Sequence, residues 1–285
     1  MLEIYSFEII FLQLIQSLSN SLLDLFFLAV TQVGNPALWI LISAFFFWNA
    51  EERKSFYLMG TVLFASALVG VLKPLIARMR PDESIARIVY QENSVFGFPS
   101  GHSAVISSIY FFYEKKLKPK MKLIGFIIVL LVMLSRIYLG VHFFLDVLAG
   151  LVLGIFIGKG ISLIESKLKG KKLESNKLFE ETGLIIAVII LLAGIILEQH
   201  PLAGLLAGYF AGIFAFKLMG FDSSKNEFRL MLLKQGIGFC FLGIILAFAL
   251  TQEYLIKSIL FFIAGVFITF IYPILFEKFK GLKKC

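Results

Sequence analysis

Charged residues are scarce in this sequence. Asp, Glu, Lys and Arg make up 16% of its 285 residues, whereas soluble domains contain about 25%. Hydrophobic residues reach 59% and aromatic residues 15%, which excludes an ordinary soluble globular protein. The composition therefore predicts an all-α, polytopic membrane protein built as a helical bundle.

Cysteine is rarer still. Cys240 lies within an apolar run and Cys285 is the last residue of the sequence, so we expect no disulfide framework. The N-terminal region carries Glu3 and Glu8 but no Lys or Arg, which argues against a cleaved signal peptide.

Basic residues exceed acidic ones, with 27 Lys and Arg and a formal net charge of +8. Most of them lie in short loops between apolar runs, so we expect them to orient the protein in the membrane rather than to bind nucleic acid. The side rich in Lys and Arg should be cytoplasmic. The opposite, outer side carries only Lys73, Arg78, Arg80, Arg87, Arg136 and Lys257.

The apolar runs divide the sequence into four segments. Residues 1–32 contain a run interrupted by polar residues, which predicts an interfacial amphipathic helix, with a spanning helix as the alternative. Residues 33–165 form a core of five spans, 166–181 a basic cytoplasmic linker, and 182–285 a C-terminal region of four further spans whose role is unknown. The nine expected spans lie near residues 33–50, up to 73, 100–114, 121–139, 142–165, 182–198, 201–219, 230–250 and 254–276.

Three short clusters gather the residues that can hold and cleave a phosphoryl group. The first is K-x6-R-P, the second P-S-G-H and the third S-R-x5-H-x3-D. All three fall at outer ends of the expected spans, as a single site requires. Their residues are Lys73, Arg80 and Pro81; Pro99, Ser100, Gly101 and His102; and Ser135, Arg136, His142 and Asp146.

The third cluster predicts a nucleophile. His142 and Asp146 are four residues apart at the start of a helix, so their side chains share one face. Asp146 can accept a proton-bearing ring nitrogen of His142 and leave the other nitrogen with a free lone pair. Such a histidine is a nucleophile or a general base. The same pair could instead be a satisfied structural contact, since partners at this spacing are common on helices.

The other cluster residues predict an anion clamp. Arg136 and Arg80 can each hold two phosphate oxygens, and Lys73 adds a point charge. Backbone N–H groups at Ser100 and Gly101 can point at the anion from a helix start, where His102 could protonate a leaving oxygen. Taken singly, Lys73 could be a snorkelling helix end, Arg136 an interfacial anchor and Ser100 an N-cap.

Together the three clusters resemble the motifs of the type 2 phosphatidic acid phosphatase (PAP2) superfamily, over roughly residues 33–165. The resemblance implies that His142 attacks phosphorus and becomes phosphohistidine, that Asp146 supports it, and that His102 protonates the leaving group. It also implies that no metal or other cofactor is required. The phosphate-binding residues it implies are Lys73, Arg80, Ser100, Gly101 and Arg136.

The expected function is that of an integral membrane lipid phosphate phosphatase. Its substrate would be phosphatidic acid, phosphatidylglycerol phosphate or a prenyl pyrophosphate, with the tail near Phe96, Phe98, Phe143 and Phe144. The alternative is a membrane transporter or lipid translocase built on the same core. We expect a multi-pass protein of the plasma (inner) membrane, with its site facing the periplasmic or extracellular side and a C-terminal region that could form a homo-oligomer.

Overall fold

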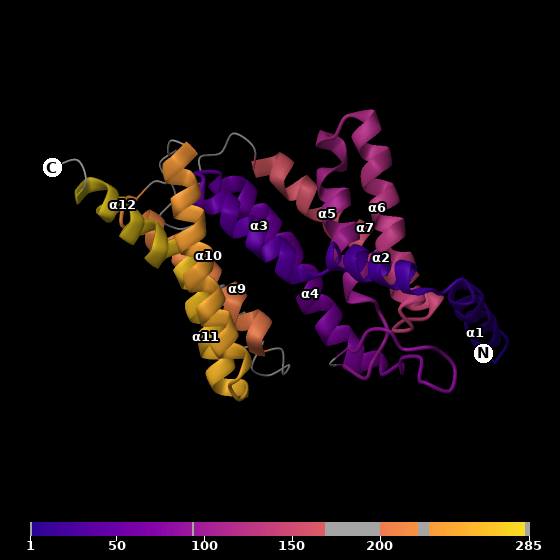
Figure 1. The fold of residues 1–285 in the computed structure, drawn as a ribbon. Helices are drawn as coiled ribbons and strands as arrows, with labels where there is room; N and C mark the ends of the chain where they lie inside the picture. Colours follow the sequence, from indigo (N-terminus) through magenta and orange to yellow (C-terminus); the bar gives the residue numbers. More distant parts are fainter. Residues whose placement is uncertain (1, 93, 169–199, 222–227, 283–285) are drawn as a thin grey trace. The chain divides into compact units, whose positions relative to one another are not determined.

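A computed structural model describes residues 2–92, 94–168, 200–221 and 228–282. These residues form helices and loops without any β-strand (Figure 1), apart from an isolated antiparallel bridge between Met79 and Phe96. The all-α prediction is therefore confirmed for this part of the chain. Two compact units are present: the first contains Met1–Trp39 and Thr61–Leu168, and the second contains Ile40–Gly60 and Lys169–Cys285.

Helix α3 and helix α4 each begin in one unit and end in the other. Each of the remaining described helices lies entirely within one of the two units. The helices that contribute to the first unit are α1 (Leu2–Gln16), α2 (Ser21–Gln32), α3 (Pro36–Trp48), α4 (Glu52–Ile76), α5 (Gly101–Tyr113), η1 (Glu114–Lys116), α6 (Pro119–Tyr138) and α7 (Phe144–Leu168). Those of the second unit are α9 (His200–Leu218), α10 (Phe228–Leu250), α11 (Tyr254–Val266), the π-helical turn η2 (Phe267–Ile271) and α12 (Tyr272–Leu282).

Six helices in the described part of the chain are long and apolar enough to cross a membrane. Nine spans were expected, and two of the corresponding helices are shorter than that: α3 and α5 have 13 residues each, or about 20 Å of helix, against a hydrocarbon core of about 30 Å. Helix α5 continues directly into η1, and its crossing of the membrane stays a prediction. Helix α3 is limited at its start by Asn35, whose side chain accepts the N–H of Ala37 at 3.0 Å, and is followed by Ala50 at a φ of 60°. The run expected at 182–198 and most of the 166–181 linker lie outside the described residues. The six helices are Glu52–Ile76, Pro119–Tyr138, Phe144–Lys167, Pro201–Leu218, Phe228–Leu250 and Leu255–Lys278.

The exposed surface of these helices is apolar, whereas several small polar side chains are inside. On α6, Leu123, Phe126 and Leu130 are exposed. Ser103 and Ser107 of α5, by contrast, are fully buried. This distribution suits a lipid bilayer, in which burying an apolar side chain brings no hydrophobic stabilisation because the lipid tails are equally apolar.

The N-terminal segment differs from the single helix expected. Two helices, α1 and α2, meet at an angle of 116°. The break occurs at Asn20, whose backbone is extended. The side chain of Asn20 accepts the N–H of Leu23 at 2.9 Å and so caps the start of α2. The polar side of α1 faces protein: Glu8 is buried, whereas Ile10 and Leu14 are exposed. Its position at the membrane interface stays a prediction.

Helices α5 and α7 form the closest helix pair of the first unit. Gly150, Gly154 and Gly158 of α7 face α5, and a Cβ built on Gly154 would lie 2.8 Å from the carbonyl oxygen of Ala104. Small residues on both helices let the two backbones approach, as is common between membrane helices. This contact holds the start of α5 against the first turn of α7.

In the second unit, α9 packs on α11 in the same way. A Cβ on Gly208 would lie 2.8 Å from the carbonyl carbon of Phe262. Buried Lys234 of α10 lies 3.7 Å from Glu277 of α12, and its ammonium is 5.2 Å from the ring of Phe276. These are stabilising contacts between helices, and the role of this unit stays unassigned.

The α5–α7 contact makes a prediction about stability. Replacing Gly154 by Val should force the helices apart and cost about 1–3 kcal/mol, lowering the thermal unfolding temperature in detergent. The control is Gly160→Val in the same helix, because a Cβ there meets nothing within 4 Å. Equal unfolding temperatures for the two variants would contradict the packing described here.

Candidate active site

The long loop between α4 and α5 brings Arg80 to the second cluster. The loop doubles back on itself, so that Arg80 N–H donates to Val95 O at 3.2 Å and Gly97 N–H donates to Arg78 O at 2.7 Å. Arg80 Nε also donates to Ser94 O at 2.7 Å. These bonds fix Arg80 close to the residues that lead into α5.

A tight turn between α6 and α7 places His142. Gly140 has a φ of 78°, which glycine adopts without a steric penalty. Val141 N–H then donates to Arg136 O at 3.2 Å, ending α6 and directing the chain into α7. His142 therefore lies just before α7, and Asp146 lies in its first turn.

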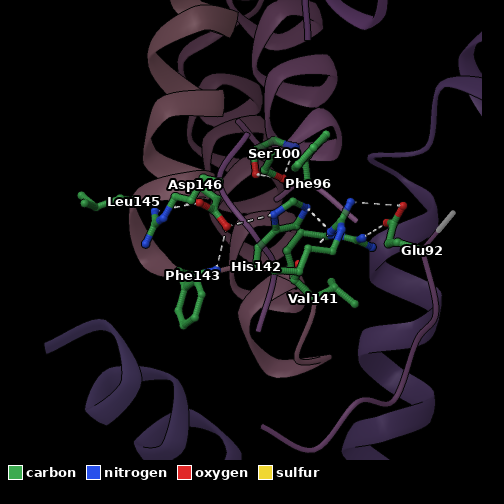
Figure 2. Close-up of polar contacts among 12 residues, drawn as sticks. Glu92, Phe96, Ser100, Val141, His142, Phe143, Leu145 and Asp146 are labelled. Atoms are coloured by element: carbon green, nitrogen blue, oxygen red, sulfur yellow. Dashed lines mark hydrogen bonds and ion pairs between the residues drawn. The ribbon is translucent and has the colours of Figure 1, made fainter. Parts of the chain in front are cut away.

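The two residues are in contact, as their spacing predicts. His142 Nδ1 lies 3.3 Å from Asp146 Oδ2, which also accepts the N–H of Phe143 at 2.9 Å (Figure 2). His142 Nε2 lies 3.0 Å from Nη1 of Arg80. Because arginine only donates, Nε2 must accept, so the ring proton is on Nδ1.

His142 is 1% exposed and is surrounded by positive charge. Burial, followed by the charges of Arg80 and Arg136, holds the pKa of His142 well below its usual value. The imidazole is therefore neutral near pH 7, which is the form that a nucleophile requires.

Glu92 occupies the centre of the expected anion clamp. Its carboxylate pairs with Nη2 of Arg136, lies 3.7 Å from Nη2 of Arg80 and 4.0 Å from Nδ1 of His102. Figure 2 shows Glu92 reaching into the group of nitrogen atoms beside His142. A carboxylate held by two arginines is in the position that a phosphoryl group would take.

Two buried nitrogen atoms of the clamp have no hydrogen-bond partner among the described residues: Nε of Arg136 and Nε2 of His102. Arg136 is fully buried; its Nη1 donates to Thr31 at 2.6 Å and its guanidinium stacks over Tyr90 at 5.3 Å. Buried polar atoms without a partner are costly. Both belong to residues that face Glu92, and a polar ligand there could satisfy them.

The remaining cluster residues lie at the edges of this group. The side chain of Ser100 caps α5, as the structural alternative had it. The expectation that the N–H of Ser100 points at the anion was wrong, because this N–H donates to Asp146 O at 2.9 Å. Gly101 begins α5. Lys73, near the end of α4, interacts electrostatically with Arg80 and Glu92. The structure thus brings residues from each of the three clusters together, whereas the hydroxyl of Ser135 donates to Val132 O within α6.

Sequence reasoning missed the acidic partners. Neither Glu92 nor Glu8 belongs to the three clusters, and Glu8 lies in the segment expected to be an interfacial helix. The one available signal was Arg78, a basic residue on the side otherwise poor in basic residues. It pairs with both Asp146 and Glu8.

Comparisons with known proteins identify the family whose motifs the three clusters resemble. The model of the PAP2 superfamily matches residues 54–169. The undecaprenyl-diphosphatase of Sulfolobus acidocaldarius is 30% identical over 148 residues, which are 51% of this chain and 72% of that protein. The chain belongs to the PAP2 superfamily.

Two further relatives match this chain over a smaller share of their own length than the undecaprenyl-diphosphatase does. Phosphatidylglycerophosphatase B of Bacillus subtilis is 39% identical over 109 residues, 35% of this chain and 52% of that protein. The lipid A 4'-phosphatase of Porphyromonas gingivalis is 28% identical over 160 residues, 50% of this chain and 66% of that protein. The chain thus spans about half to two thirds of these two relatives.

The crystal structure of a transmembrane PAP2 type phosphatidylglycerolphosphate phosphatase from Bacillus subtilis matches with a TM-score of 0.52 and 28% identity, covering 60% of this chain and 90% of that one.

The position of Glu92 predicts competition with anions. Replacing Glu92 by Gln removes the carboxylate that pairs with Arg80 and Arg136, so inorganic phosphate should bind roughly tenfold more tightly. Isothermal titration in detergent measures this affinity. Glu83→Gln, an exposed change in the same loop, should have no effect. Unchanged or weaker phosphate binding by Glu92→Gln would show that Glu92 does not occupy the anion position.

Proposed function

We propose that this protein is a membrane lipid phosphatase that hydrolyses a phosphomonoester or pyrophosphate lipid through a phosphohistidine intermediate. The observation that carries the proposal is the orientation of His142: its Nδ1 faces Asp146, and its Nε2 faces Arg80 beside the anion clamp. Two buried nitrogen atoms of the clamp, on Arg136 and His102, have no hydrogen-bond partner among the described residues.

In the first step, Nε2 of His142 attacks phosphorus, and the bond between phosphorus and the leaving oxygen breaks. Asp146 stabilises the positive charge that develops on the imidazole. Arg80, Arg136 and Lys73 stabilise the charge on the phosphoryl oxygens, with backbone N–H groups at the start of α5. His102, in its protonated form, gives a proton to the leaving oxygen. Burial, followed by the charge of Arg136, lowers the pKa of His102 in the free protein, and the negative charge of the bound phosphate favours its protonated form.

In the second step, water attacks the phosphohistidine. His102, now neutral, removes a proton from that water, and the bond between Nε2 and phosphorus breaks to release phosphate. The electrons of the bond return to His142, which regains its neutral form. We propose that the cationic side chains supply the electrostatic stabilisation that a metal ion gives in other phosphoryl-transfer enzymes.

The lipid nature of the substrate is supported by the surroundings of the clamp. Leu75, Met79 and Val95, next to the first and second clusters, are 73%, 60% and 62% exposed. The expectation for Phe143 was wrong, because Phe143 is 1% exposed and belongs to the core of the first unit. Phe144 is partly buried and packs on Phe11 at 5.2 Å, and its contact with a lipid tail stays a prediction.

The relatives named above act on different lipid phosphates, so the head group stays open among the three substrate classes that the sequence suggested. Nothing in the described residues or the comparisons favours a transporter. We place the site at the outer leaflet of the plasma membrane on the basis of the loop charges.

A panel assay tests the function. Purified protein should release phosphate from at least one of phosphatidic acid, phosphatidylglycerol phosphate and a prenyl pyrophosphate. Long-chain substrates should be turned over with a higher kcat/KM than water-soluble short-chain analogues, and excess EDTA should not lower the rate. Absence of phosphate release from every lipid, or a rate abolished by EDTA and restored by magnesium, would contradict the proposal.

Thiol labelling tests the side of the membrane. Glu92 is unsuitable as a labelling position because it is paired inside the site, whereas Glu83 is exposed in the same loop and Lys118 is exposed before α6. In a background without Cys240 and Cys285, Glu83→Cys should react with a membrane-impermeant reagent in intact cells, and Lys118→Cys only after permeabilisation. The reverse pattern would place the site on the cytoplasmic side.

A further inference from the structure

Arg78 lies in the six-residue spacer of the first cluster, between Lys73 and Arg80. Its side chain bridges two buried carboxylates. Its Nη1 donates to Oδ1 of Asp146 at 2.8 Å, and its Nη2 pairs with Oε2 of Glu8. Its guanidinium also lies 5.1 Å from the ring centre of Phe143. Asp146 therefore has both oxygens engaged: Oδ1 by Arg78 and Oδ2 by His142 and the N–H of Phe143.

Glu8 reaches this group from the N-terminal helix α1. It is 1% exposed, and its second oxygen, Oε1, accepts the N–H of Leu145 at 2.9 Å. Leu145 is in the first turn of α7, where backbone N–H groups are not used by the helix itself. One glutamate thus holds both Arg78 and the helix start that carries Asp146.

We propose that Glu8 and Arg78 are positioning residues for the nucleophile, acting on His142 through Asp146. Arg78 fixes the carboxylate of Asp146 so that Oδ2 points at Nδ1 of His142. Glu8 balances the charge of Arg78, so that Asp146 keeps enough negative charge to stabilise the imidazolium formed during attack. This inference rests on the proposed function, since it assigns the pair to the same reaction.

A second ion pair joins the N-terminal helices to the same loop and provides a control. Arg87 Nη1 and Nη2 lie 2.9 and 2.6 Å from the two oxygens of Asp24 in α2. Asp24 also accepts the hydroxyl of Tyr138 at 2.7 Å. None of these groups contacts Asp146 or His142, so this pair anchors the loop without reaching the nucleophile.

The test compares Glu8→Gln, Arg78→Gln and Asp24→Asn by kcat, KM and the pH dependence of kcat/KM. The acid limb reports the apparent pKa of the His142–Asp146 pair in the free enzyme. The charged groups that face His142 and Asp146 are Arg78, Glu8, Arg80, Arg136, Lys73 and His102.

Removing the negative charge of Glu8 should move the acid limb to lower pH, and removing the positive charge of Arg78 should move it to higher pH, each by at least about 0.5 unit. Both variants should lose roughly tenfold or more in kcat with KM within about twofold of wild type. Asp24→Asn should leave the limb in place. Arg78→Lys keeps the charge and serves if Arg78→Gln fails to fold; its acid limb should stay near that of wild type.

Opposite shifts support the inference, because a loss of packing alone cannot move the limb in two directions. No shift, or shifts in one direction, overturns it. If the wild-type protein hydrolyses no lipid phosphate, the proposed function fails by itself. The pH dependence of orthovanadate affinity, measured by titration calorimetry on the same variants, then tests the inference with the same signs.

Discussion

Charges buried in a membrane protein must be paired, and this requirement organises the first unit. The side chains around His142 form a continuous series of carboxylates and cationic groups, joined through the neutral imidazole of His142. It runs from Glu8 through Arg78 and Asp146 to His142, and from there through Arg80 and Glu92 to Arg136. In the proposed function, the substrate phosphate takes the place of the Glu92 carboxylate between Arg80 and Arg136.

The fold supports that series with backbone contacts rather than with polar side chains alone. The glycines of α7 let α5 approach until the N–H of Ser100 reaches the carbonyl of Asp146. The glycine turn between α6 and α7 sets His142 beside Arg80. The break at Asn20 turns α2 away from α1, and Thr31 of α2 binds Arg136 while Glu8 of α1 binds Arg78. The N-terminal segment is thus part of the site's support.

The sequence predicted the parts of this arrangement that depend on short spacing. The contact between His142 and Asp146 was expected from their spacing, although His142 lies just before α7 and not within it: the first turn of α7 brings the Asp146 carboxylate back to His142 and to the N–H of Phe143. The helical, membrane-spanning character followed from composition. The grouping of the three clusters followed from their common side of the membrane. The family resemblance is confirmed by the comparisons.

What the sequence did not predict depends on contacts between distant segments. Glu8 and Arg78 are 70 positions apart, and no local pattern links them. Glu92 could not be placed because the course of a long loop depends on its bonds to other segments. Phe143 is adjacent to a motif yet buried, since an aromatic residue next to a helix start can turn to either side. The length of α3 depends on the cap and the turn that bound it, which hydropathy does not report.

The central claim is that Nε2 of His142 bonds to phosphorus. It is tested most directly by mixing the protein with a lipid substrate carrying labelled phosphate, quenching within one turnover under alkaline conditions, and locating the label by mass spectrometry of peptides. The account predicts an alkali-stable, acid-labile phosphoryl group on His142, and none on the His142→Ala protein. Label on another residue, or turnover by His142→Ala at the wild-type rate, would contradict it.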